Sequence, residues 1–204
     1  AAMMALDKAV KMSHDLDMQE VAFYNYAVAS LQGGTIPFGS SVANFEEFLT
    51  RYPNSKFVPK VQEYIVTGYM TDNNYERALS SIEKISQPSA TILSAKQRVL
   101  YSLGVKEYNL KNITHAIARF TQSKELASYD VNLAKEADLW IGNCYYSRDD
   151  YNNAIEAYKA FVNQSHEGST NLPLGYYNLG YAYFQNKQYN EAEEAFDKFV
   201  SSRK

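Results

Sequence analysis

The sequence predicts an all-α fold built from repeated pairs of short antiparallel helices. Apolar residues recur three and four positions apart through most of the chain, which is the spacing of one buried helix face. The same pattern returns at a constant interval, most clearly between Gly142 and Gly180. All 5 prolines fall in predicted turns or near first helical turns, so none interrupts a helix centre.

The clearest repeat unit lies at the C-terminal end. Apolar residues run from Tyr176 to Phe184, stop at the polar stretch 185–188, and resume from Tyr189 to Phe199. Two amphipathic helices joined by a short turn explain this arrangement. A shift by the interval from Gly142 to Gly180 pairs equivalent side chains throughout: Leu179 with Ile141, Tyr183 with Tyr145, Tyr189 with Tyr151, Ala192 with Ala154, Phe196 with Tyr158, and Phe199 with Phe161.

Earlier parts of the chain keep this register with weaker matches. Gly104 and Phe120 occupy the equivalent places one unit back, and Val66 replaces the glycine in the unit before that. We therefore predict a single solenoid over residues 1–204, which includes a remnant helix of an earlier repeat at 3–12. Its five repeats are expected at 22–58, 59–96, 97–134, 135–172 and 173–204.

The residue types at the repeated positions have a packing reason. Small residues such as Gly142 and Gly180 let two helices approach closely, and large rings such as Tyr158 and Phe196 fill the space around that contact. A lone hairpin buries little apolar surface, so the hairpins are expected to stack. Asp72, Asn112 and Asp150 are the predicted N-caps of three second helices.

This pattern of Leu-Gly and Tyr in one helix, followed by Tyr, Ala and an aromatic residue in the next, resembles the tetratricopeptide repeat (TPR) family. The resemblance implies a right-handed superhelix that acts as a scaffold or adaptor for a protein or peptide. The segment from Phe48 to Ser55 resembles junctions of bacterial cell-envelope TPR proteins, so we expect a periplasmic or cell-envelope location.

Composition and motifs speak against several classes of protein. The net charge is -3, which gives no field to attract nucleic acid. No apolar stretch is long enough to insert in a membrane. The single cysteine, Cys144, and 3 scattered histidines form no metal-ligand or nucleophile motif. We expect no cofactor, no metal site and no catalytic residue, and hence not an enzyme.

The candidate binding site is the face of the first helices that TPR proteins turn toward their inner groove. This face is rich in tyrosine and poor in charge, as is common where a partner docks. An alternative is that some of these rings pack between repeats instead. The predicted ligand-binding residues are Tyr64, Arg98, Tyr101, Tyr108, Trp140, Asn143, Tyr146, Tyr177, Asn178 and Tyr181.

The sequence is compatible with two kinds of ligand. Asn143 and Asn178 match two asparagines of the TPR clamp that grips a peptide's terminal carboxylate, but Leu139 replaces the lysine expected one turn earlier. The chaperone-type clamp is therefore disfavoured, and an extended peptide or partner helix is preferred. The alternative is a glycan, because rings beside carboxamides can stack on sugars and bond to their hydroxyls.

Overall fold

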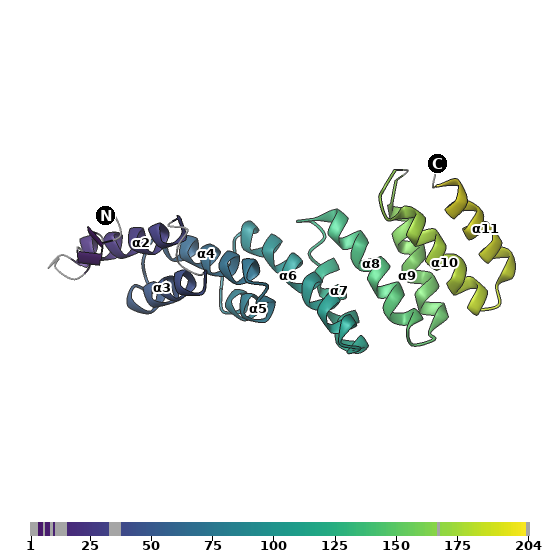
Figure 1. Cartoon of the computed structure of the whole chain (residues 1–204), viewed down its shortest axis with the longest axis horizontal. Helices are drawn as coiled ribbons and strands as arrows, with labels where there is room; N and C mark the ends of the chain where they lie inside the picture. The colour runs from purple at the N-terminus through teal and green to yellow at the C-terminus, as the bar shows by residue number, and fades with distance from the viewer. Residues whose placement is uncertain are drawn as a thin grey trace. The chain divides into compact units, whose positions relative to one another are not determined.

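The computed structural model describes residues 4–5, 7–8, 10, 16–32, 38–166 and 168–202 (Figure 1). Within these residues every regular element is a helix, which confirms the predicted all-α fold class. Residues 4–5, 7–8 and 10 are helical, and the rest of the predicted helix at 3–12 lies outside the described residues. The longer helices are α2 (Leu16–Gln32), α3 (Phe38–Arg51), α4 (Val58–Thr71), α5 (Tyr75–Glu83), α6 (Ala90–Asn109), α7 (Ile113–Lys124), α8 (Val131–Tyr146), α9 (Tyr151–Gln164), α10 (Leu172–Gln185) and α11 (Tyr189–Ser201).

The chain divides into two compact units, Ala1–Ala95 and Lys96–Lys204, and the division falls within α6. We call them the N-terminal unit and the C-terminal unit. The sequence predicted one solenoid of five repeats, and those repeat boundaries remain a prediction.

In the C-terminal unit, α8 packs against α9 and α10 against α11, and α9 also packs against α10 (Figure 1). Buried side chains from both hairpins form one core around Tyr158, Phe161, Leu172 and Leu179. The two hairpins stack because α9 carries two apolar residues, Phe161 and Val162, on the face that does not pack against α8. Stacking of the next hairpin buries these residues.

Close helix approach occurs at the repeated glycines, as the sequence predicted. A Cβ atom at Gly142 would stand 2.4 Å from the Tyr158 ring, and one at Gly180 would stand 2.6 Å from the Phe196 ring. Gly104 faces Phe120 in the same way. Each glycine is therefore the residue that lets a second-helix ring lie directly on a first-helix backbone.

The turns inside four hairpins share one geometry. Asn73, Lys111, Asp149 and Lys187, which follow one another at the repeat interval, all have positive φ angles between 54° and 65°. In each turn the next residue's N–H donates to a carbonyl five residues earlier, which is the helix-ending pattern known as a Schellman motif. The residue after each left-handed position is therefore the N-cap of the next helix. Asn112 and Asp150 are N-caps as predicted, but Asp72 ends α4 and Asn74 caps α5.

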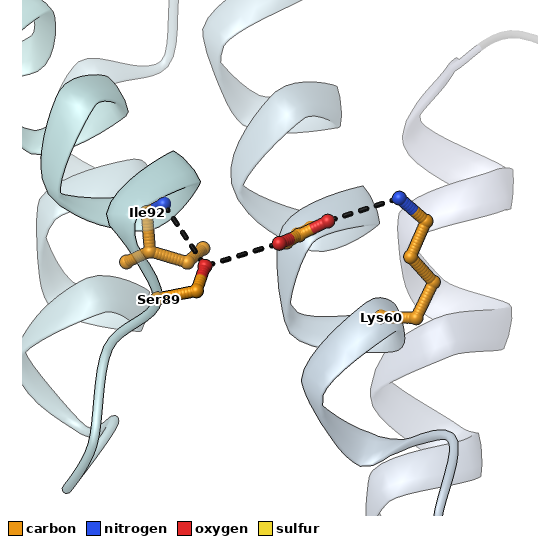
Figure 2. Close-up of polar contacts among 4 residues, drawn as sticks. Lys60, Ser89 and Ile92 are labelled. Carbon is orange, nitrogen blue, oxygen red and sulfur yellow. Dashed lines mark hydrogen bonds and ion pairs between the residues drawn. The ribbon is translucent and has the colours of Figure 1, made fainter.

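In the N-terminal unit, polar contacts fasten α4 to the start of α6. Glu63 accepts a hydrogen bond from Lys60 (3.0 Å) and another from the Ser89 hydroxyl (3.0 Å). The same hydroxyl accepts from the backbone N–H of Ile92 (3.3 Å) and so caps α6, and Figure 2 shows this chain of contacts from Lys60 to Ile92. The hydrogen bond from Lys60 lowers the pKa of Glu63 below its ordinary value.

Candidate functional site

A pocket of about 370 Å³ opens in the C-terminal unit where the first helices of successive hairpins meet. This volume lies within the range of small ligand pockets, roughly 300–1,000 Å³. We call it the tyrosine pocket. Its lining consists of Tyr108 from α6, Asn143, Tyr146 and Ser147 from the end of α8, Tyr158 from α9, and Tyr177, Asn178 and Tyr181 from α10.

A three-residue hydrogen-bond network lies in this lining. Asn143 Oδ1 accepts from the Tyr158 hydroxyl (2.8 Å) and from Asn178 Nδ2 (3.0 Å). Both lone pairs of this oxygen are therefore used, which fixes the orientation of the Asn143 carboxamide. Among the described residues no hydrogen bond uses Asn143 Nδ2 or Asn178 Oδ1, and neither atom is buried without a partner. The carboxamide pair thus keeps free N–H groups on both asparagines and one free acceptor, Asn178 Oδ1.

The tyrosine rings are held by other rings. Tyr177 and Tyr181 lie with ring centroids 4.8 Å apart, and both also contact Phe196 of α11. Tyr146 meets Tyr151 edge-on at 5.4 Å, and Tyr108 meets Trp140 edge-on at 5.3 Å. Tyr177 and Tyr181 are nevertheless 39% and 41% exposed, so their surfaces are available to a ligand.

Burial or hydrogen bonding raises the pKa of three phenols in the pocket, those of Tyr108, Tyr158 and Tyr177. Burial raises the pKa of Tyr158 far above its ordinary value, and it also raises the pKa of Tyr108. The hydrogen bond to Tyr181 raises the pKa of Tyr177. The lining contains no Asp, Glu, Lys, Arg or His. The pocket is therefore uncharged, and each of these hydroxyls is a neutral hydrogen-bonding group.

The structure brings together six of the ten residues that the sequence predicted, while their role in binding stays a prediction. These six line the tyrosine pocket: Tyr108, Asn143, Tyr146, Tyr177, Asn178 and Tyr181.

Two more predicted residues do not line the pocket but are linked to it through Tyr108, which Trp140 meets edge-on. Trp140 Nε1 donates to the Tyr101 hydroxyl (2.7 Å), and the Trp140 ring stacks on Phe120 at 5.8 Å. Arg98 is exposed and does not line the tyrosine pocket. Tyr64 belongs to the N-terminal unit, where it stacks on Phe45 at 5.0 Å.

From the sequence, Tyr158 was predicted only to pack in the hairpin core. The structure gives it two roles, because its ring is 2% exposed beneath Gly142 while its hydroxyl reaches Asn143 in the pocket. A signal for the second role was present in the sequence. The equivalent residues Phe120 and Phe196 have no hydroxyl, so the tyrosine carries one atom that packing does not require.

Other chemistry lacks a site in the described part of the chain. No group of three or more His, Cys, Asp or Glu side chains there could hold a metal ion. Cys144 is fully buried, and burial raises the pKa of its thiol to about 12, which suppresses the reactive thiolate. No helix among those described has the length and apolar character needed to cross a membrane.

Comparison with known proteins identifies the repeats. Two models of the tetratricopeptide repeat match, one at residues 136–165 and one at residues 173–201. No curated protein matches the sequence.

Several solved structures share the fold at low sequence identity. A crystal structure of MamA is 18% identical, with a TM-score of 0.54 over 87% of this chain and 94% of that one. YrrB, described as a TPR protein with an unusual peptide-binding site, is 19% identical with a TM-score of 0.54, over 99% of this chain and 93% of that one. BtubC from P. vanneervenii is 16% identical with a TM-score of 0.52, over 99% and 89%. Residues 136–165 and 173–201 are therefore tetratricopeptide repeats, and the chain has the all-helical solenoid fold of tetratricopeptide-repeat proteins.

Proposed function

We propose that this chain is a non-catalytic scaffold that binds an extended peptide segment of a partner protein in the tyrosine pocket. The main observation that supports this proposal is the hydrogen-bonded carboxamide pair, Asn143 and Asn178, in an uncharged lining rich in tyrosine. The similarity to YrrB, whose description includes a peptide-binding site, supports a peptide as the ligand.

The carboxamide pair fits the N–H and C=O of one residue in an extended chain, because these two groups point to the same side. Internal hydrogen bonds occupy Asn143 Oδ1 and one N–H of Asn178, which leaves Asn143 Nδ2 as a donor and Asn178 Oδ1 as an acceptor. A peptide backbone offers a carbonyl acceptor and an N–H donor at short spacing, so an extended segment can satisfy both. Because the two asparagines hold each other, little side-chain entropy is lost on binding.

A glycan is the alternative ligand, since tyrosine rings beside carboxamides also suit sugars. Sugar rings carry several hydroxyl groups that each need a partner when they are buried. The Asn143 carboxamide already uses its oxygen to bind Tyr158 and Asn178, so fewer polar atoms remain for a sugar. This difference favours the peptide.

We extend this proposal to the residues beside the pocket and to the location of the protein. Tyr101 and Trp140 would continue the groove beyond the pocket, with Arg98 available to an acidic residue of the partner. The resemblance of the segment from Phe48 to Ser55 favours a protein of the bacterial cell envelope.

The proposal is tested by comparing two exposed tyrosines on neighbouring helices. Peptides would be selected from a random display library on the wild-type chain, and their Kd values measured by fluorescence anisotropy. Tyr181→Ala removes a pocket ring, so we expect it to weaken binding by about 2 kcal/mol, as loss of an aromatic anchor commonly does.

Tyr189→Ala is the matched control. Tyr189 is 58% exposed on α11 and does not line the pocket, so its removal should leave the Kd unchanged. Selected peptides that bind both variants equally well would show that the tyrosine pocket is not the binding site. If the wild-type chain selects no peptide but binds oligosaccharides on a glycan array, and Tyr181→Ala abolishes that binding, the ligand is a glycan and not a peptide.

A further inference from the structure

We infer that the tyrosine pocket selects uncharged, proline-rich segments bound as a polyproline II helix. This inference rests on the proposed function and adds to it the chemical class of the peptide. It follows from three properties of the lining: the absence of charge, the fixed rings and the position of the carboxamide pair.

The lining excludes charged side chains of the ligand. It consists of five tyrosines, two asparagines and one serine, which supply hydrogen bonds but no counter-charge. A lysine or glutamate that entered the pocket would lose hydration without gaining an ion pair, and this costs more than burying an uncharged group. The segment that binds is therefore neutral where it meets these rings.

The rings are already ordered before a ligand arrives. Tyr177 and Tyr181 contact each other at 4.8 Å, and edge contacts fix Tyr146 and Tyr108 against Tyr151 and Trp140. Proline complements such a surface because its ring is compact, apolar and locks the backbone to one φ value. Both partners then lose little conformational entropy, which is the reason aromatic grooves recognise proline-rich segments in general.

The carboxamide pair distinguishes between conformations of the ligand. In an α-helix the backbone carbonyls and N–H groups bond to each other, so a bound helix could not satisfy Asn143 Nδ2 and Asn178 Oδ1. A polyproline II helix has no internal hydrogen bonds and leaves its carbonyls free. Because proline lacks an N–H, the residue that donates to Asn178 Oδ1 must be a non-proline residue between prolines.

Three synthetic peptides labelled with fluorescein test this inference by anisotropy. The first has two prolines in each turn of three residues, separated by alanine or serine. The second replaces every proline by alanine, and the third keeps the prolines but replaces the intervening residues by glutamate and lysine. We expect the alanine peptide to bind about tenfold more weakly, because its free chain is less ordered, and the charged peptide to bind at least as weakly.

Two protein variants connect the result to the pocket. Tyr181→Ala should weaken binding of the proline peptide by about 30-fold, and Tyr189→Ala should leave it unchanged. If the proline and alanine peptides bind equally and both depend on Tyr181, proline selection is overturned while peptide binding in the pocket stands. If the proline peptide binds independently of Tyr181, the inference is also overturned. If none of these peptides binds and library selection also yields no Tyr181-dependent peptide, both the inference and the proposed function are overturned.

Discussion

The close approach of α8 and α9 at Gly142 yields a prediction with a worked magnitude. Adding a single methyl group in Gly142→Ala places a Cβ atom 2.4 Å from two ring carbons of Tyr158, well inside van der Waals contact. The ring has little freedom to withdraw, because it is 2% exposed and its hydroxyl is bonded to Asn143. The clash must therefore be relieved by moving α9 away from α8.

Two opposing contributions set the size of the effect. Overpacking a well-filled site costs typically about 1–3 kcal/mol, and the confined Tyr158 ring places this site near the upper end. Alanine is more favourable than glycine within a helix by about 1 kcal/mol. We therefore expect Gly142→Ala to lower the free energy of unfolding by about 2 kcal/mol. Gly180→Ala meets Phe196 at 2.6 Å, but Phe196 is only half-buried and can turn outward, so its net effect should be close to zero.

The comparison is made by urea denaturation monitored through tryptophan fluorescence. Trp140 is the only tryptophan, and it stacks on Phe120 in the C-terminal unit, so its emission reports the unfolding of that unit. The substitution Asn163→Ala, at an exposed position near the end of α9, controls for general effects. If Gly142→Ala and Gly180→Ala lower the free energy of unfolding equally, then confinement of the facing aromatic ring does not determine how much the added methyl group destabilises the fold.

Two further predictions concern the turns and the buried thiol. Lys187 has a φ of 62°, a conformation that costs a side chain roughly 1–2 kcal/mol, so Lys187→Gly should stabilise the chain by about 0.5–1 kcal/mol after the entropy of glycine is counted. Gln185→Gly, in the last turn of α10, should instead destabilise by about 1 kcal/mol, and thermal melts of the two variants must move in opposite directions. The Cys144 thiol has an ordinary pKa of 9.0 when unfolded and a pKa of about 12 when folded, so above pH 9 the unfolded state loses its proton first and stability falls as the pH rises. Between pH 9 and 11 the free energy of unfolding of the wild type, measured by urea melts, should fall by about 2 kcal/mol more than that of Cys144→Ala. If the free energies of the two proteins change with pH in parallel, the thiol is not buried in its protonated form.

The hairpin fold could be predicted because its determinants are local and repeated. The constant repeat interval located Gly104, Gly142 and Gly180 and the rings that cover them, since side-chain size alone identifies those positions. The N-cap of α5 was predicted too early in the turn. Asp72 and Asn74 are both good capping residues, and the choice of Asn74 depends on Asn73 taking a left-handed conformation. Asparagine adopts that conformation more readily than most residues, but the run Asp72-Asn73-Asn74 does not by itself determine which residue does so.

The candidate site could be predicted in outline only. Helical periodicity determines which residues share a face. It therefore placed Asn143, Tyr177 and Tyr181 on the same face of the first helices, where they line the tyrosine pocket. The network that orients Asn143 was missed, since Tyr158 reaches it from the following helix and Asn178 from the next hairpin. Contacts between helices at this level of detail depend on interhelical distances that the periodicity does not contain.

The hairpin of α10 and α11 buries its last apolar residues less completely than the hairpin of α8 and α9. Phe161 and Val162 of α9 are 2% and 7% exposed beneath α10, whereas the equivalent Phe199 is half-buried and Val200 is 61% exposed. Amide hydrogen exchange in α10 and α11 should therefore proceed through local opening at a lower free energy than in α8 and α9. One wall of the tyrosine pocket, including Tyr181, lies on α10. Ligand binding is thus thermodynamically linked to closure of this hairpin, and an occupied pocket should slow exchange along α11, whose residues do not line the pocket.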